Sequence, residues 1–190
     1  IRKCEDGQVD VIDYYDDLKD IYKTVVYLGK GTNKEEIIVS PYINLLPQDY
    51  LEHLNFKCDI VKSSFSNIDI RLNGLVTEFV LNCIRAYDID NSKIEILDLA
   101  MFVNNELLEK SKDVANIINS FQIVRRKRKL ETEEIKQLIE IRDKESSKII
   151  KAAICILLEN YTEFEFYYNE ISIKEKLEFK KYPILNLKKK

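Results

Sequence analysis

The sequence predicts an all-α protein, an irregular bundle of five to seven helices that ends in a C-terminal helical hairpin. Apolar side chains recur at alternating steps of three and four along most of the chain, which is the spacing of one helical face. Glycine and proline are scarce, at four and three in 190 residues, whereas turn-rich all-β folds need more of both. We expect a helical bundle over residues 1–130 and a hairpin subdomain over 131–190 packed on it, or one domain made of both.

The first predicted helix covers residues 10–28, where the apolar residues keep helical phase. Asp10 suits its N-cap, because a carboxylate there accepts from an unpaired backbone amide. Gly29 and Gly31 are typical of a helix end. Four further aspartates make the outer face of this helix acidic: Asp13, Asp16, Asp17 and Asp20.

The following segment is less regular. The apolar run 37–39 is either a short strand or a buried loop, and residues 47–54 favour a short helix with proline in its first turn. A long helix is predicted over 57–87, because eight apolar residues keep phase across it. Gly74 inside that helix is typical of a close helix crossing.

Capping signals mark the later helices. Two capping boxes are present, Ser92 with Glu95 and Ser172 with Glu175. The apolar stripe after Ser92 is interrupted at residues 110–113, which predicts a kink or a change of packing partner. Another helix opens near Thr132, a polar stretch at 142–147 interrupts it, and Pro183 ends the last short helix.

Residues 147–171 have the pattern of two short antiparallel helices. Ala152 is a small residue where the helices would cross, Tyr161 follows a polar turn, and Tyr168 takes a bulky position of the second helix. In these features the segment resembles one tetratricopeptide-type helical hairpin, and the resemblance implies a protein-binding scaffold. Phe164 departs from that family, which keeps its position small, and an ordinary helix pair accounts for the same residues.

The motifs of common enzymes are absent. His53 is the only histidine, and HExxH, GxGxxG, GxxxxGK[ST] and GxSxG do not occur. We therefore expect no catalysis, no cofactor and no metal, with the acidic residues of 10–20 forming a solvated helix face.

The cysteines are far apart in the sequence: Cys4, Cys58, Cys83 and Cys155. This spacing favours reduced thiols and a cytoplasmic protein. No apolar run reaches the length of a membrane span, so we expect no membrane partner.

Aromatic residues near the C-terminus form the first candidate binding surface. The expected partner-binding residues are Tyr161, Phe164, Tyr167 and Tyr168. Together with Phe166 they cannot all face inward from one short helix, so some remain available to a partner. The main hypothesis is a non-enzymatic protein-interaction or regulatory module of an intracellular complex, bound to another protein or to a second copy of itself.

The second candidate surface is a run of five cations: Arg125, Arg126, Lys127, Arg128 and Lys129. Such a run can neutralise several phosphates. The alternative hypothesis is therefore a nucleic-acid-associated accessory protein that contacts the phosphate backbone. The net charge of −3 weighs against a general attraction to nucleic acid. A place in a bacterial defence or toxin-linked system is part of this alternative, since richness in Lys, Ile, Asn and Tyr is typical of AT-rich genomes.

Overall fold

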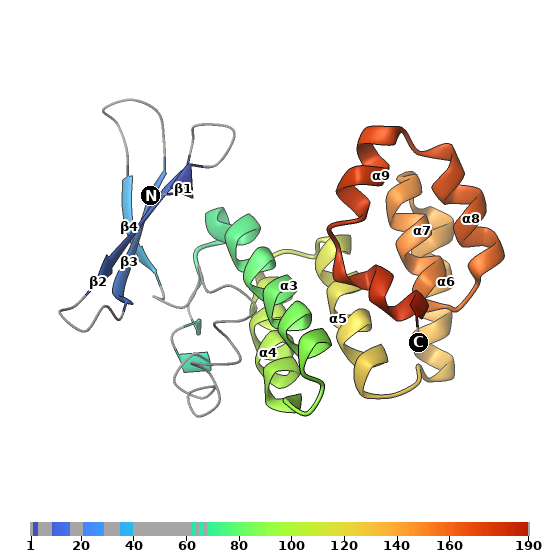
Figure 1. Cartoon of the computed structure of the whole chain (residues 1–190), viewed down its shortest axis with the longest axis horizontal. Coiled ribbons are helices and arrows are strands. Elements are labelled where there is room, and N and C mark those ends of the chain that lie inside the picture. The colour runs from blue at the N-terminus through green and yellow to red at the C-terminus, as the bar shows by residue number, and fades with distance from the viewer. Residues whose placement is uncertain are drawn as a thin grey trace.

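The computed structural model describes residues 2–3, 9–15, 21–28, 35–39, 62–63, 65–66 and 68–189. A helical bundle dominates it, as the sequence predicts, with seven α-helices between Asn73 and Phe179 in the described part of the chain. An antiparallel sheet precedes the bundle in the sequence and lies beside it (blue in Figure 1). The all-α bundle is thus confirmed as the main architecture, and the sheet is an addition to it.

The sheet has four strands in sequence order: β1 (Arg2–Lys3), β2 (Val9–Tyr15), β3 (Ile21–Leu28) and β4 (Glu35–Val39). All neighbours are antiparallel, and Val11 of β2 pairs with Val26 of β3. The helix predicted over 10–28 is therefore wrong, and Asp10 lies within β2 instead of capping a helix. For residues 37–39, the strand alternative is confirmed. The helix predicted over 47–54 lies outside the described residues, as do Asp16, Asp17 and Asp20.

The residue types explain why β3 is a strand. Residues 21–28 are rich in β-branched and aromatic side chains, which favour a pleated surface. Thr24, Val25 and Val26 are all fully buried, although successive side chains of a strand point to opposite faces. Both faces of β3 are therefore covered at this point. The helical spacing over 10–28 joined apolar residues of two separate strands and was coincidental.

The helix predicted over 57–87 is interrupted in the structure. A short 3-10 helix, η1 (Ile70–Leu72), precedes α3 (Asn73–Ile89). The Asp69 carboxylate accepts from the backbone amide of Arg71 at 2.9 Å, which caps the new start. The apolar stripe nevertheless forms core as predicted, with Phe65 and Phe79 among its buried members. Residues 57–61 lie outside the described residues.

Gly74 does not mark a helix crossing. It is exposed, and an added methyl group would meet no atom of the described residues within 4 Å outside its own helix. Replacing Gly74 by alanine should therefore raise the free energy of unfolding by about 0.5 kcal/mol, because alanine has fewer unfolded conformations to lose. A urea melt measures this change. A lower stability of Gly74→Ala would show that the position is crowded or strained after all.

The remaining helices are α4 (Ile94–Lys110), α5 (Val114–Lys127), α6 (Thr132–Lys144), α7 (Lys148–Leu157), α8 (Tyr161–Glu170) and α9 (Ile173–Phe179), followed by η2 (Pro183–Lys189).

The interruption predicted at 110–113 is confirmed as a break between α4 and α5. The Ser172 capping box is confirmed. The Ser92 box is wrong, because the Ser92 hydroxyl donates to the Asp90 carboxylate at 2.7 Å.

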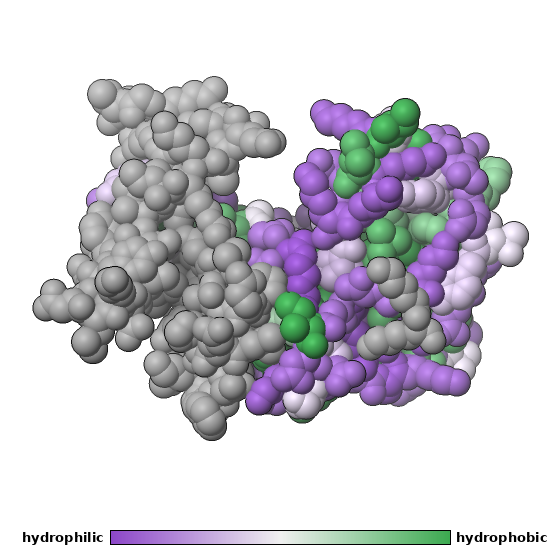
Figure 2. Space-filling model, viewed as in Figure 1, coloured by the Kyte–Doolittle hydropathy of each residue, from purple (hydrophilic) through white to green (hydrophobic). Residues whose placement is uncertain are grey.

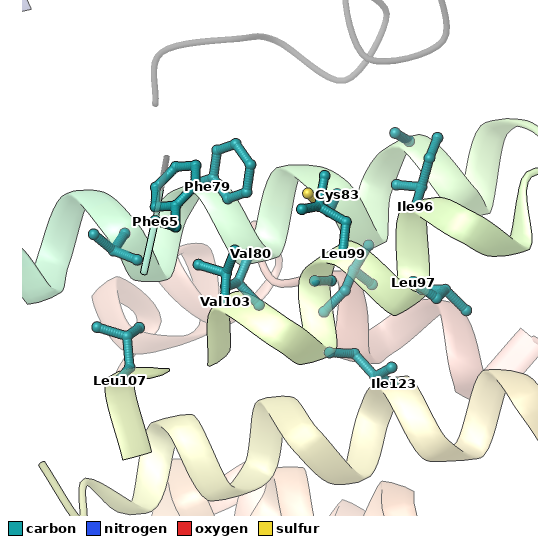
Figure 3. Close-up of a cluster of buried hydrophobic side chains, with 14 of the residues drawn as sticks. Phe65, Phe79, Val80, Cys83, Ile96, Leu97, Leu99, Val103, Leu107 and Ile123 are labelled. Carbon is teal, nitrogen blue, oxygen red and sulfur yellow. The ribbon is translucent and has the colours of Figure 1, made fainter. Parts of the chain in front are cut away.

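Two clusters of buried apolar side chains hold the helices together. The first joins α3 and α4 (Figure 3) and includes Val26 of the sheet. The second joins α5, α6, α7, α8, α9 and η2. Helix α5 belongs to both, since Ile123 contributes to the first cluster and Ile118 to the second. The predicted division at residue 130 stays a prediction.

The C-terminal segment η2 is fixed to α3 and α5 by hydrogen bonds. Arg126 of α5 donates to the Pro183 carbonyl at 2.8 Å and to both oxygens of Asp88 at 2.7–2.8 Å. The side-chain amide of Asn186 donates to the same Asp88 at 2.8 Å. Residues far apart in the sequence therefore meet at one buried ion pair.

Candidate functional site

The basic run 125–129 does not form an open cationic surface. Arg125 pairs with Glu159, Lys127 with Asp98, and Arg128 with Glu134 at 2.7 Å. The Arg128 guanidinium lowers the pKa of the Glu134 carboxyl by hydrogen bonding. The guanidinium of Arg126 is fully buried against Asp88.

These ion pairs weaken the case for the predicted phosphate-binding site, which stays a prediction. Carboxylates on other segments neutralise four of its five cations, and Arg126 cannot reach a phosphate without unfolding its surroundings. Lys129 is exposed, and among the described residues it is the one member of the run without an ion pair. The sequence showed the run of charges but not its acidic partners, three of which lie 29 to 38 residues away along the chain.

The predicted aromatic surface on α8 is only partly present. Phe164 is 2% exposed, and its ring stacks on Tyr168 and on Phe179 of α9. Its assignment as a partner-binding residue is therefore wrong, because it belongs to the core. Tyr167 and Tyr168 are half-buried, each with a lysine ammonium over its ring. Tyr161 and Phe166 are exposed, so α8 does leave aromatic side chains accessible.

Helix α9 presents an apolar pair to solvent that the sequence analysis did not select. Ile173 is 79% exposed and Leu177 57% exposed, while Phe179 on the opposite side is buried in the second cluster. Ile173 and Leu177 are four residues apart and lie on one helical face. Hydrophobic residues are visible over α9 in the space-filling view (Figure 2, top; α9 as placed in Figure 1).

Lysines flank this apolar pair on both sides. At about 100° per residue, Lys174 of α9 and Lys180, its C-cap residue, lie on opposite sides of the pair. Both are exposed, as is the next residue, Lys181, which pairs with Glu178 at 2.7 Å. Residues 172–190 contain seven lysines and two glutamates, in a chain whose net charge is −3. The exposed face of α9 is therefore apolar at its centre and positive at its edges.

A pocket of about 160 Å³ lies between α5, α7 and the C-terminal segment. Its lining is Ala115, Ile118, Asn119, Gln122, Ile149, Ile150, Ala153, Phe179, Tyr182 and Ile184. None of these residues is charged, and most are apolar. The lining comes from three segments that are distant in the sequence, so no local pattern could have predicted it.

Two buried amides form the polar part of this pocket. Gln122 donates from Nε2 to the Asn119 carbonyl oxygen at 2.7 Å, and its own side-chain oxygen accepts from Arg126 at 3.4 Å. Asn119 is 5% exposed. Neither amide has a polar atom that is both fully buried and without a partner in the described part of the chain.

No family model, curated protein or solved structure matches the chain. Helices α7 and α8 do form a helical hairpin with close mutual contacts. The resemblance of residues 147–171 to a tetratricopeptide hairpin stays a prediction.

The described residues contain no group of three His, Cys, Asp or Glu side chains placed to hold a metal ion. Cys83 and Cys155 are buried thiols, and burial raises the pKa of Cys155 to about 11, so this thiol is protonated at neutral pH. Cys4, Cys58 and His53 lie outside the described residues.

None of the described helices combines the length and the apolar character of a membrane span.

Proposed function

We propose that the protein is a non-enzymatic interaction module, and that the exposed face of α9 binds an acidic amphipathic helix of a partner protein. The observation that carries this proposal is the outward-facing pair Ile173 and Leu177 with lysines on both sides. A partner helix with two apolar residues flanked by Asp or Glu would match this face. Its apolar residues would contact Ile173 and Leu177, and its carboxylates would lie beside the lysines.

The two parts of the face contribute differently to binding. Burying Ile173 and Leu177 against apolar residues removes their surface from water, which supplies most of the affinity. Lys174 and Lys180 attract an acidic partner and set its orientation, which mainly affects the association rate and specificity. Affinity should therefore depend strongly on the apolar pair, and salt should weaken binding only moderately.

A protein partner accounts for this face better than a membrane or a nucleic acid. Membrane binding of a surface helix scales with its buried apolar area, and α9 has seven residues with only two exposed large apolar side chains. Nucleic-acid binding through phosphates would use the lysines and would leave Ile173 and Leu177 without a role.

The test uses a synthetic acidic peptide with two leucines four residues apart and glutamates beside them. The wild-type protein should bind it more tightly than a scrambled peptide of the same composition, as measured by fluorescence anisotropy. The double change Ile173→Asp with Leu177→Asp should reduce the affinity at least tenfold, because it removes apolar contact and adds like charge.

Ile89→Asp is the matched control, since Ile89 is an exposed isoleucine at the end of α3. It should leave peptide binding unchanged. Equal binding of the scrambled peptide, or unchanged binding by the double variant, would contradict the proposal. Retention of duplex DNA or RNA at about 50 mM salt, lost as salt rises but insensitive to Leu177→Asp, would instead favour the nucleic-acid alternative.

A further inference from the structure

Another pocket, of about 150 Å³, lies where the end of α5, the start of α6 and the end of α7 meet. Four of its lining residues are apolar, Leu130, Ile135, Leu157 and Leu158, and three are charged, Arg125, Lys129 and Glu159. Leu157 is buried, whereas Lys129, Ile135 and Glu159 are exposed. The pocket is therefore apolar at its base and open to solvent between charged side chains.

The Arg125 guanidinium has hydrogen-bond donors that no described residue uses. Its partner in the described part of the chain is the Glu159 carboxylate, which accepts from Nη2. Its Nε is buried and has no acceptor there. The side chain is only 13% exposed, so water can satisfy few of the remaining donors, and a buried donor without an acceptor is unfavourable. An acceptor bound beside this guanidinium would relieve that cost.

The charges of the lining favour an anion as that acceptor. Arg125 and Lys129 are positive and Glu159 is negative, so the pocket carries one net positive charge. The Glu159 side chain is 58% exposed, and water screens its charge, whereas Arg125 is mostly buried. The buried cation therefore attracts an anion more strongly than the exposed carboxylate repels it.

The geometry and the apolar residues select the kind of anion. A carboxylate matches the planar fork of a guanidinium, from which it can accept two parallel hydrogen bonds. Apolar cavities of about 150 Å³ take up benzene, which has the bulk of about six carbons. A phosphate group would leave Leu157 and Leu158 without a role, and its second negative charge would exceed the single positive charge of the pocket.

We propose that this pocket binds a monocarboxylate with a branched apolar chain of about five carbons, its carboxylate against Arg125 and Lys129 and its chain against Leu157 and Leu158. Such a group occurs in a small free acid and at the C-terminus of a protein that ends in leucine. The site is separate from the exposed face of α9, because no residue of α9 lines it.

The test titrates the wild-type protein with 4-methylpentanoate at neutral pH and about 50 mM salt, followed by calorimetry. Saturable binding should occur in the low millimolar range or tighter, which a ligand of about eight non-hydrogen atoms can reach. 4-Methylpentanamide has the same shape without the charge and should bind at least tenfold more weakly. Acetate and inorganic phosphate lack the apolar chain and should also bind at least tenfold more weakly.

Three variants locate the site. Arg125→Met removes the buried donors and should lower the affinity for 4-methylpentanoate at least tenfold. Lys129→Gln should lower it about threefold because this ammonium is exposed. Its matched control is Lys112→Gln, which changes an exposed lysine between α4 and α5 and should have no effect. Glu159→Gln should raise the affinity about threefold, because it removes the opposing charge and weakens the hold on Arg125. A purely structural pair of Arg125 and Glu159 would not produce this gain.

Two peptides separate the sources of the carboxylate. N-acetylglycylleucine carries its carboxylate on a leucine, and N-acetylglycylleucinamide is the same peptide without the charge. Tighter binding of the free peptide than of 4-methylpentanoate, lost on amidation, would support a site for a protein C-terminus. The reverse order would support a site for a free acid.

Three results would overturn the proposal. The first is no saturable binding of 4-methylpentanoate up to about 50 mM, beyond the weak limit of specific binding. The second is equal binding of 4-methylpentanamide or of inorganic phosphate. The third is unchanged binding by both Lys129→Gln and Glu159→Gln, two exposed positions whose substitution leaves the core intact. Unchanged 4-methylpentanoate binding by the Ile173→Asp, Leu177→Asp variant would support the separation of this pocket from the face of α9.

Discussion

Replacing Arg126 by methionine should lower the free energy of unfolding by about 3–5 kcal/mol. The Arg126 guanidinium is fully buried, and it donates to Asp88 at 2.7 Å and to the Pro183 carbonyl at 2.8 Å. Methionine fills part of the space but donates nothing. The Asp88 carboxylate would then lie in a mostly buried position with Asn186 as its remaining donor, and a buried charge without its counterion is strongly unfavourable.

Denaturant melts of the variants measure this effect. Lys127→Met is the matched control, because Lys127 is the next residue and its ion pair with Asp98 is exposed, so its loss should cost less than about 1 kcal/mol. The double change Arg126→Met with Asp88→Leu should be less destabilising than Arg126→Met alone, since it removes the stranded charge. A loss below about 1 kcal/mol for Arg126→Met would show that the ion pair is not held as described.

Replacing Phe79 by alanine should also cost about 3–5 kcal/mol. Phe79 is completely buried in the first cluster, with its ring centroid 4.4 Å from that of Phe65 (Figure 3). The change removes this contact and leaves a cavity that the neighbouring helices can only partly fill. Phe166→Ala is the control, since Phe166 is 59% exposed and its loss should cost less than about 0.5 kcal/mol. Equal effects of the two changes would contradict the assignment of Phe79 to the core.

The parts of the fold that depend on local signals were predictable from the sequence. Helices α4 to α9 follow the periodic spacing of apolar residues, and the Ser172 box and the break before Val114 lie where the residues indicate. The sheet was missed because its evidence is pairing between strands. Val11 pairs with Val26 across β2 and β3, whereas along the chain Val11 and Val25 fit one helical stripe.

The candidate sites were harder to predict, because they depend on which face of an element is buried. Ile173 and Leu177 are visible in the sequence as an apolar pair, but Phe179 on the other side of α9 is equally apolar, and only packing decides which side faces the core. The role of Arg126 depends on Asp88 and Pro183, which are 38 and 57 residues away along the chain. No local pattern connects such residues.

The attachment of η2 to α3 also determines when during synthesis the bundle can be completed. Asn186 lies 98 residues after Asp88, and ribosomes add about 5–20 residues per second, so roughly 5–20 s separate the two residues as the chain emerges. Arg126 follows Asp88 by 38 residues, so for the last part of that interval the Asp88 carboxylate lacks only its donor from Asn186. The contacts of η2 with α3 and α5 can therefore form only after η2 is synthesised, and until then the surfaces that η2 covers stay open to solvent.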